Sequence, residues 1–88
     1  MDQRPGLNDK QARAVTARLL DLAQVRGPKK SFCPFEVARA LCSDWRPMMP
    51  LVRACAAELV DQGRLRATQK GLPVHPLRAK GPIRLRLP

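Results

Sequence analysis

The chain has 88 residues, which is the size of one small domain. Lys and Arg number 17 against 7 Asp and Glu, so the formal net charge at pH 7 is +10, and aromatic residues make up only 3%. So few aromatic side chains argue against a protein that binds single strands by base stacking. So short a chain buries only about 60–65% of its unfolded surface, which argues against an enzyme that encloses a substrate. We therefore expect a binding protein and no catalytic residues.

Cysteine usage and hydropathy predict a cytoplasmic protein without a membrane partner. No apolar run approaches the roughly 20 residues of a membrane span, and the first residues lack the apolar segment of a signal peptide. Cys33, Cys42 and Cys55 are odd in number, and their spacing fits neither zinc nor a disulfide framework. We expect reduced packing residues, no metal and no cofactor. A metal site made of Cys33, Cys42 and His75 is the alternative, although His75 lies in a predicted turn as an exposed loop residue.

The first predicted element is an amphipathic helix over residues 9–25. Residues 1–7 contain Pro and Gly without periodicity, so we expect a disordered tail, followed by Asn8 as a helix cap. Gly27 and Pro28 end the helix. The apolar residues recur at steps of three and four: Ala12, Val15, Leu19 and Leu22.

Two further helices are predicted after a short connector at residues 29–32, which has room for a strand of two or three residues at most. Pro34 suits the first position of a helix that ends near Cys42. Ser43 and Asp44 offer an N-cap, and an irregular turn at 44–48 precedes a helix from about Pro50 to Gly63.

After Gly63 the hydrophobic period changes from helical to two, which predicts strands at 64–68 and 83–87. Residues 70–82 contain two Gly and three Pro, so we expect a long loop without a strand. The alternation places apolar residues against the helices, namely Leu65, Ala67, Ile83, Leu85 and Leu87. It places four basic residues on the opposite face: Arg64, Arg66, Arg84 and Arg86.

The predicted order is helix, short strand, helix, helix, strand, wing, strand. This order is typical of an α+β fold, a small winged helix, with residues 8–88 as a single domain. The second and third helices would form the helix-turn-helix pair, and the hairpin would form the wing.

Four segments carry a resemblance to a known family: CPFEVARAL at 33–41, DWRPMMPLVRACAAELVDQGRL at 44–65, TQKGLPVHP at 68–76 and GPIRLRL at 81–87. Together they resemble a bacterial family of small uncharacterised proteins over about residues 12–87. The resemblance implies a winged-helix fold. It implies no activity, because the family is a domain of unknown function.

Most of the charge lies at the C-terminal end of the chain. Residues 63–88 contain seven Lys and Arg and no Asp or Glu. Four arginines on adjacent strands repel one another, and the phosphates of a nucleic acid would offset that repulsion. The alternative is a solvated basic face that serves solubility.

The third helix predicts modest sequence specificity. Its outward face should carry Arg53, Ala57, Glu58 and Asp61, so only its N-terminal part suits a major groove. Trp45 should pack between helices. Arg46 would either reach a phosphate or pair with Asp44 or Glu36, and Arg39 would pair with Asp44.

We therefore expect a protein that binds nucleic acid, duplex DNA more than RNA, and that acts as a transcription regulator. The alternative is an adaptor that binds a protein or a ribonucleoprotein. The predicted nucleic-acid-binding residues are Lys29, Lys30, Arg46, Arg53, Lys70, Arg78 and Lys80.

Overall fold

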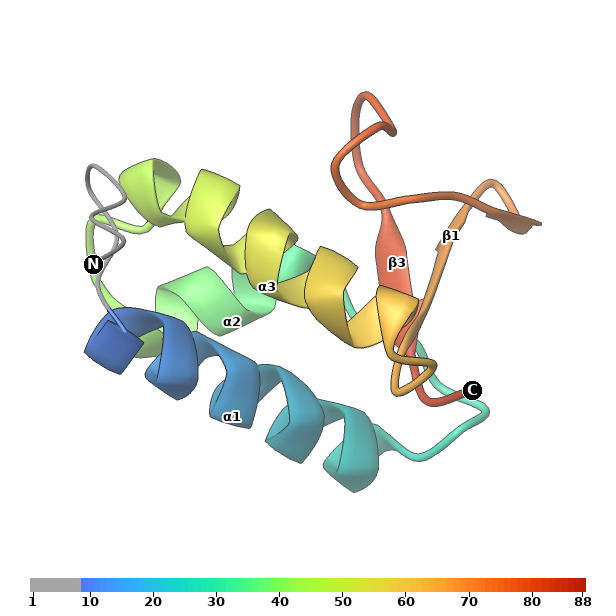
Figure 1. Cartoon of the computed structure of the whole chain (residues 1–88), viewed down its shortest axis with the longest axis horizontal. Coiled ribbons are helices and arrows are strands. Elements are labelled where there is room, and N and C mark those ends of the chain that lie inside the picture. Colours follow the sequence, from blue (N-terminus) through green and yellow to red (C-terminus); the bar gives the residue numbers. More distant parts are fainter. Residues whose placement is uncertain (1–8) are drawn as a thin grey trace.

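The computed structural model describes residues 9–88, so the predicted tail at 1–7 and the Asn8 cap lie outside the described residues. Three α-helices pack against a small antiparallel sheet (Figure 1). Their bounds are α1 Asp9–Arg26, α2 Pro34–Leu41 and α3 Met49–Asp61, with a 3₁₀ turn η1 at Arg46–Met48. The predicted helices and the irregular turn before the third helix are confirmed.

Local chemistry explains where these helices begin and end. Gly27 has φ 80°, and its N–H donates to Ala23 O at 2.9 Å, which ends α1. At the start of α2 the Glu36 carboxylate accepts a 2.9 Å hydrogen bond from the Cys33 N–H. The prediction that Ser43 or Asp44 caps the third helix is wrong, because Met48 is the N-cap of α3 and makes no side-chain capping bond.

The sheet has the strand order β2-β1-β3, with β1 at Arg66–Gln69, β2 at Leu72–Pro73 and β3 at Arg84–Arg86. The β1–β3 hairpin is as predicted, but β2 corrects the expectation that residues 70–82 hold no strand. Lys70 and Gly71 both have positive φ, 52° and 82°, and this two-residue turn folds β2 back onto β1. We call residues 70–82 the wing loop.

The connector before α2 joins the sheet through one residue. Phe32 bridges to Leu85, and the two exchange N–H···O bonds of 2.8 and 2.7 Å. This single-residue bridge stands where a short strand was expected, and no strand forms there. It ties the connector to β3 and leaves Phe32 fully buried.

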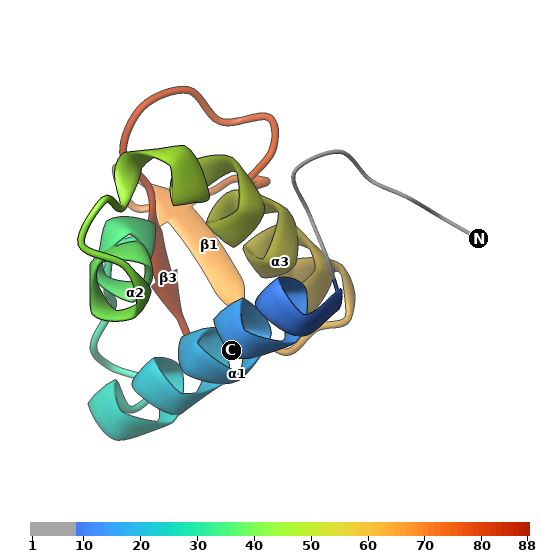
Figure 2. The ribbon, with the colours of Figure 1, turned by 90° about the vertical axis from the view of Figure 1, so that its left-hand side faces the viewer.

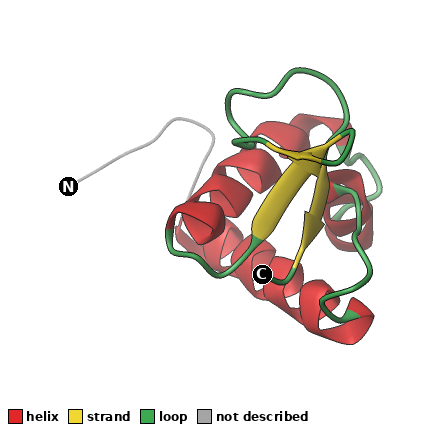
Figure 3. Cartoon of the chain, turned by 90° about the vertical axis from the view of Figure 1, so that its right-hand side faces the viewer, coloured by secondary structure: helices red, strands yellow, loops and turns green. Residues whose placement is uncertain are grey.

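The helices cover one face of the sheet, and the other face is open (Figures 2 and 3). The core lies between the two layers and joins α1, α2, α3, Phe32 and the inward residues of the strands. Leu65, Ala67, Ile83 and Leu85 are buried as predicted, and Leu87 packs against them while half-buried. The α+β architecture is confirmed and is compatible with a small winged-helix-like fold.

Candidate nucleic-acid interface

The open face of the sheet carries the basic residues of both long strands. In the β1–β3 register Arg66 lies opposite Arg86 and Thr68 lies opposite Arg84. Between these pairs Ala67 and Leu85 point into the core, where both are buried. Arg66, Arg84 and Arg86 therefore share the outward side, because side chains alternate along a strand. We call these three residues the sheet face.

The three arginines of the sheet face differ in how they are held. Arg84 Nε donates to Ser31 Oγ at 2.9 Å, and its Nη2 donates to Ser31 O at 2.8 Å. Within residues 9–88, Arg66 and Arg86 have neither an ion pair nor a side-chain hydrogen bond. Like charges that lie opposite each other on paired strands destabilise the pairing. An anion bound between Arg66 and Arg86 would therefore stabilise the β1–β3 pair.

Arg64 departs from the prediction, because it precedes β1 and does not share the register of the sheet face. The N–H groups of Arg64 and Leu65 both donate to Leu59 O, at 2.8 and 3.2 Å, and so complete the end of α3. The preceding Gly63 has φ 74°, which turns the chain there. The side chain of Arg64 is exposed.

One acid offsets part of the charge near this face. Glu36 pairs with Arg26 at 2.6 Å. Burial by itself raises the pKa of Glu36, but the Cys33 N–H and the Arg26 guanidinium outweigh that effect. The charge of Arg84 acts in the same direction, so the pKa of Glu36 lies below its ordinary value of 4.5 and the carboxylate stays ionised at neutral pH.

The structure places Arg53 against the wing loop, whereas the sequence predicted it on the outward face of the third helix. Its guanidinium donates to three backbone carbonyls of the wing loop: Pro76 O at 2.9 Å, Ala79 O at 2.9 Å and Gly81 O at 3.2 Å. The expectation of a free Arg53 on an outward helix face is therefore wrong. The sequence could not show this, because the three carbonyls lie 23 to 28 residues further along the chain and backbone groups carry no sequence signal.

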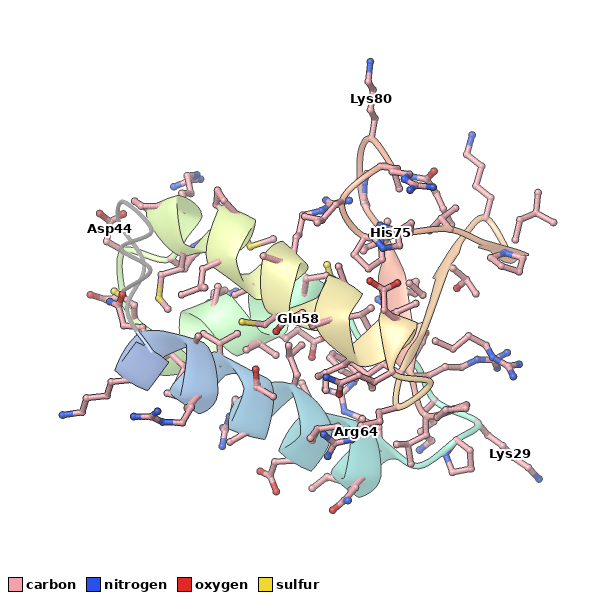
Figure 4. The ribbon with its side chains drawn as sticks, viewed as in Figure 1. Lys29, Asp44, Glu58, Arg64, His75 and Lys80 are labelled. Atoms are coloured by element: carbon pink, nitrogen blue, oxygen red, sulfur yellow. The ribbon has the colours of Figure 1, made fainter. Side chains whose placement is uncertain are left out.

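The wing loop also covers the face of α3 that was expected to enter a groove. Pro76 is buried, Ala57 is only 2% exposed, and His75 Nε2 lies 3.2 Å from Asp61 Oδ1. His75 is thus a half-buried loop residue rather than an exposed one. Glu58 and Asp61 remain exposed on α3 and would repel phosphates, so this helix is poorly suited to a major groove (Figure 4).

Arg46 and Arg39 contact aromatic rings instead of the predicted acids. The Arg46 guanidinium lies 4.8 Å from the centroid of the Trp45 ring, and that of Arg39 lies 5.8 Å from the centroid of Phe35. The two rings lie 5.8 Å apart. Glu36 pairs with Arg26, so the predicted pairing of Arg46 with Glu36 is wrong. Trp45 is half-buried and packs against the core, which agrees with its predicted packing role.

The remaining predicted site residues are exposed but do not converge. Lys29 and Lys30 lie in the connector after α1, whereas Lys70, Arg78 and Lys80 lie in the wing loop. Figure 4 shows Lys29 and Lys80 on opposite sides of the molecule. Lys70 and Lys80 line one hollow of the wing loop. The seven predicted residues therefore fall into separate groups.

Sequence reasoning missed two polar residues that position these groups. Ser31 holds Arg84, and Gln69 Nε2 donates to Lys80 O at 2.6 Å and Pro82 O at 3.1 Å. Ser31 lies outside the four segments that carry the family resemblance, and Gln69 lies in one of them without a role that the resemblance assigns. Pairing the connector with the last strand would not have found Ser31, because in the antiparallel Phe32–Leu85 pairing Ser31 lies opposite Arg86 rather than Arg84.

The cysteines form no common site. Cys33 and Cys42 are half-buried, Cys55 is buried, and none of the three forms a disulfide. Residues 9–88 hold no group of three or more His, Cys, Asp or Glu placed to bind a metal ion. None of their helices has the length and apolar character that crossing a membrane requires.

Comparison with known proteins gives a family but no activity. No curated protein matches the chain. One family model matches residues 12–88, which include both the helices and the sheet. The chain therefore belongs to the family described as a protein of unknown function (DUF3253).

Proposed function

We propose that this protein is a small winged-helix protein of the cytoplasm that binds duplex DNA through its phosphate backbone and regulates transcription with modest sequence specificity. The observation that carries the proposal is that Arg66 and Arg86 lie opposite each other on the open sheet face. Within residues 9–88, neither side chain has an ion pair or a hydrogen bond. Two guanidiniums held opposite each other suit phosphate, which guanidinium recognises by paired hydrogen bonds.

The surrounding charge supports a polyanion rather than a single anion. Arg84 lies on the same face and contacts Ser31, which directly follows the exposed Lys29 and Lys30. The whole segment 63–88 contains no acid that would interrupt it. Such a surface gives salt-dependent binding by release of counterions.

Modest specificity follows from α3. Arg53 is occupied by the wing loop, and Glu58 is exposed on the same helix. Readout of base edges in a major groove needs free hydrogen-bonding side chains there. Contacts to phosphates position a protein on a duplex without reading its sequence.

The test is the salt dependence of duplex DNA binding for the double variant Arg66→Gln/Arg86→Gln. Two lost phosphate contacts should reduce the slope of log affinity against log salt by roughly 1.8, at about 0.9 per contact. The matched control is Lys10→Gln/Arg13→Gln, which removes the same charge from the exposed side of α1. We expect the control to leave the slope unchanged.

Equal slopes for the two double variants would mean that only total charge matters and would overturn the sheet face as the binding surface. Duplexes of random sequence should bind within a few-fold of one another. A strong preference for RNA over DNA duplexes would instead favour the adaptor on a ribonucleoprotein.

A further inference from the structure

The wing loop contains a hollow that the proposed DNA contact does not use. It opens between the β1–β2 turn and the segment before β3, with a volume of about 690 Å³. Its walls are mainly apolar: Leu72, Pro73, Val74 and Pro82. Lys70 and Lys80 also line it, while no acidic or aromatic residue does. Lys80 projects from the loop into solvent (Figure 4).

The two walls of this hollow are braced from within the protein. Gln69 at the end of β1 donates to the carbonyls of Lys80 and Pro82. Arg53 holds the same loop from the side of α3, through Pro76 and Gly81 among others. The hollow is therefore formed without a ligand, which lowers the entropic cost of binding one.

Two residues of the hollow lower the stability of the isolated protein, one by its exposure and one by its backbone conformation. Leu72 is 68% exposed. Lys70 has φ 52° at a turn position that favours Asn or Gly, and a lysine there costs stability. Backbone strain of this kind concentrates at functional sites. Here the strained residue places a cation beside an apolar surface.

We propose that this hollow binds an extended peptide segment of another protein, in which a carboxylate side chain neighbours a leucine or valine. The carboxylate would pair with Lys70 or Lys80, and the apolar side chain would cover Leu72. Pro73 lacks an N–H and blunts the β2 edge, so recognition runs through side chains rather than through an added strand.

A peptide fits the hollow better than a nucleic acid does. A single strand would need aromatic rings on which to stack its bases, and none of the lining residues has one. A duplex backbone would leave the apolar wall uncovered. The proposal does not rest on DNA binding by the sheet face.

The test is fluorescence anisotropy with short labelled peptides. The probe alternates Glu with Leu, and two comparison peptides alternate Glu with Ser and Lys with Leu. We expect the Glu–Leu peptide to bind about tenfold tighter than either comparison peptide, because only it supplies both the charge and the apolar contact.

Matched variants locate the binding. Leu72→Ser should weaken the Glu–Leu peptide about tenfold, whereas Leu77→Ser should not, because Leu77 is 61% exposed in the same loop but does not line the hollow. Lys70→Asn should weaken binding about two- to fivefold and still melt at the same or a higher temperature, because Asn suits the turn.

Equal effects of Leu72→Ser and Leu77→Ser would overturn the proposal, as would equal binding of the Glu–Ser and Glu–Leu peptides. Preferential binding of a single-stranded oligonucleotide, lost in Leu72→Ser, would also overturn it. The sheet-face variant Arg66→Gln/Arg86→Gln should keep peptide binding, so this proposal and the DNA proposal fail separately.

Discussion

Arg53 shows how one side chain can position a whole loop. A guanidinium offers five N–H donors in a fixed plane, and here it engages carbonyls of Pro76, Ala79 and Gly81. Between β2 and β3 the loop backbone makes one turn, in which His75 O accepts from the N–H groups of Arg78 and Ala79 at 3.0 and 2.9 Å. Arg53 supplies N–H donors to three further carbonyls of the loop, which a neighbouring strand would supply in a sheet.

We predict that Arg53→Ala lowers the free energy of unfolding by about 1–3 kcal/mol, because it leaves partly buried carbonyls without donors. Arg53→Lys should recover only part of this loss, since an ammonium is a point donor that cannot span the three carbonyls. Chemical denaturation measures both variants. An Arg53→Ala protein as stable as the parent would contradict the anchoring role.

Glu36 predicts a dependence of stability on pH. Its pKa is lowered in the folded protein, so its contribution is complete above its unfolded pKa and is lost as pH falls through the folded value. Glu36→Gln should therefore be less stable than the parent at neutral pH, and the difference should shrink as pH falls below 4.5.

The control for this titration is Asp21→Asn. Asp21 pairs with Arg18 at 3.6 Å, but both side chains are largely exposed, so this pair should contribute little at any pH. Thermal melts of the two variants over an acid pH series compare them. A difference for Glu36→Gln that does not change with pH would assign its effect to packing.

At the scale of the elements, the junction between α3 and β1 sets which side of the sheet faces the core. Gly63 adopts φ 74°, and Leu59 O accepts hydrogen bonds from the N–H groups of the two residues after Gly63. This closure buries Leu65 and places Arg66 outward at the start of β1. A shift of one residue would exchange the two faces of the strand.

We predict that Gly63→Ala costs about 1 kcal/mol of stability, because a Cβ disfavours positive φ. Apart from Gly63 and its two chain neighbours, no residue has an atom within 4 Å of the position that this Cβ would take, so the loss comes from the backbone conformation alone. Gly63→Asn should be milder, since Asn tolerates this conformation. Equal melting temperatures of the Ala variant and the parent would contradict this reading.

For the whole molecule, the core depends on a few residues that join its layers. Phe32 is fully buried and pairs with Leu85 through the backbone, so it links the connector, the sheet and the helices. A chain of 88 residues has a total stability of about 4–13 kcal/mol. One such side chain is a large share of that total.

We predict that Phe32→Ala costs about 3–5 kcal/mol and leaves a marginally folded protein, since it removes packing for both layers. Phe32→Leu should cost less, because most of the buried volume is kept. Urea unfolding of both variants measures the losses. If Phe32→Ala lowered the free energy of unfolding by less than Gly63→Ala does, the packing of the helices on the sheet would not depend on Phe32.

Periodicity and local chemistry by themselves determined the elements and the side of each that is buried. The change from a helical period to a period of two after Gly63 predicted the β1–β3 hairpin, and the Pro and Gly positions predicted the helix ends. These features are local, because a helix stripe and a strand alternation are properties of neighbouring residues. The accumulation of positive charge after residue 63 is likewise visible in the sequence.

Only the tertiary structure decided which basic residues are free to bind. Arg53 and Arg66 look alike in the sequence, yet the first is consumed by the wing loop and the second faces solvent opposite Arg86. β2 and the hollow depend on a turn in which Lys70 adopts a positive φ, which is unfavourable for lysine. They also depend on Gln69, whose side chain donates a hydrogen bond to Lys80 O across the loop. These contacts join residues distant in the chain, and their donors meet backbone carbonyls, which every residue has and which no sequence pattern distinguishes.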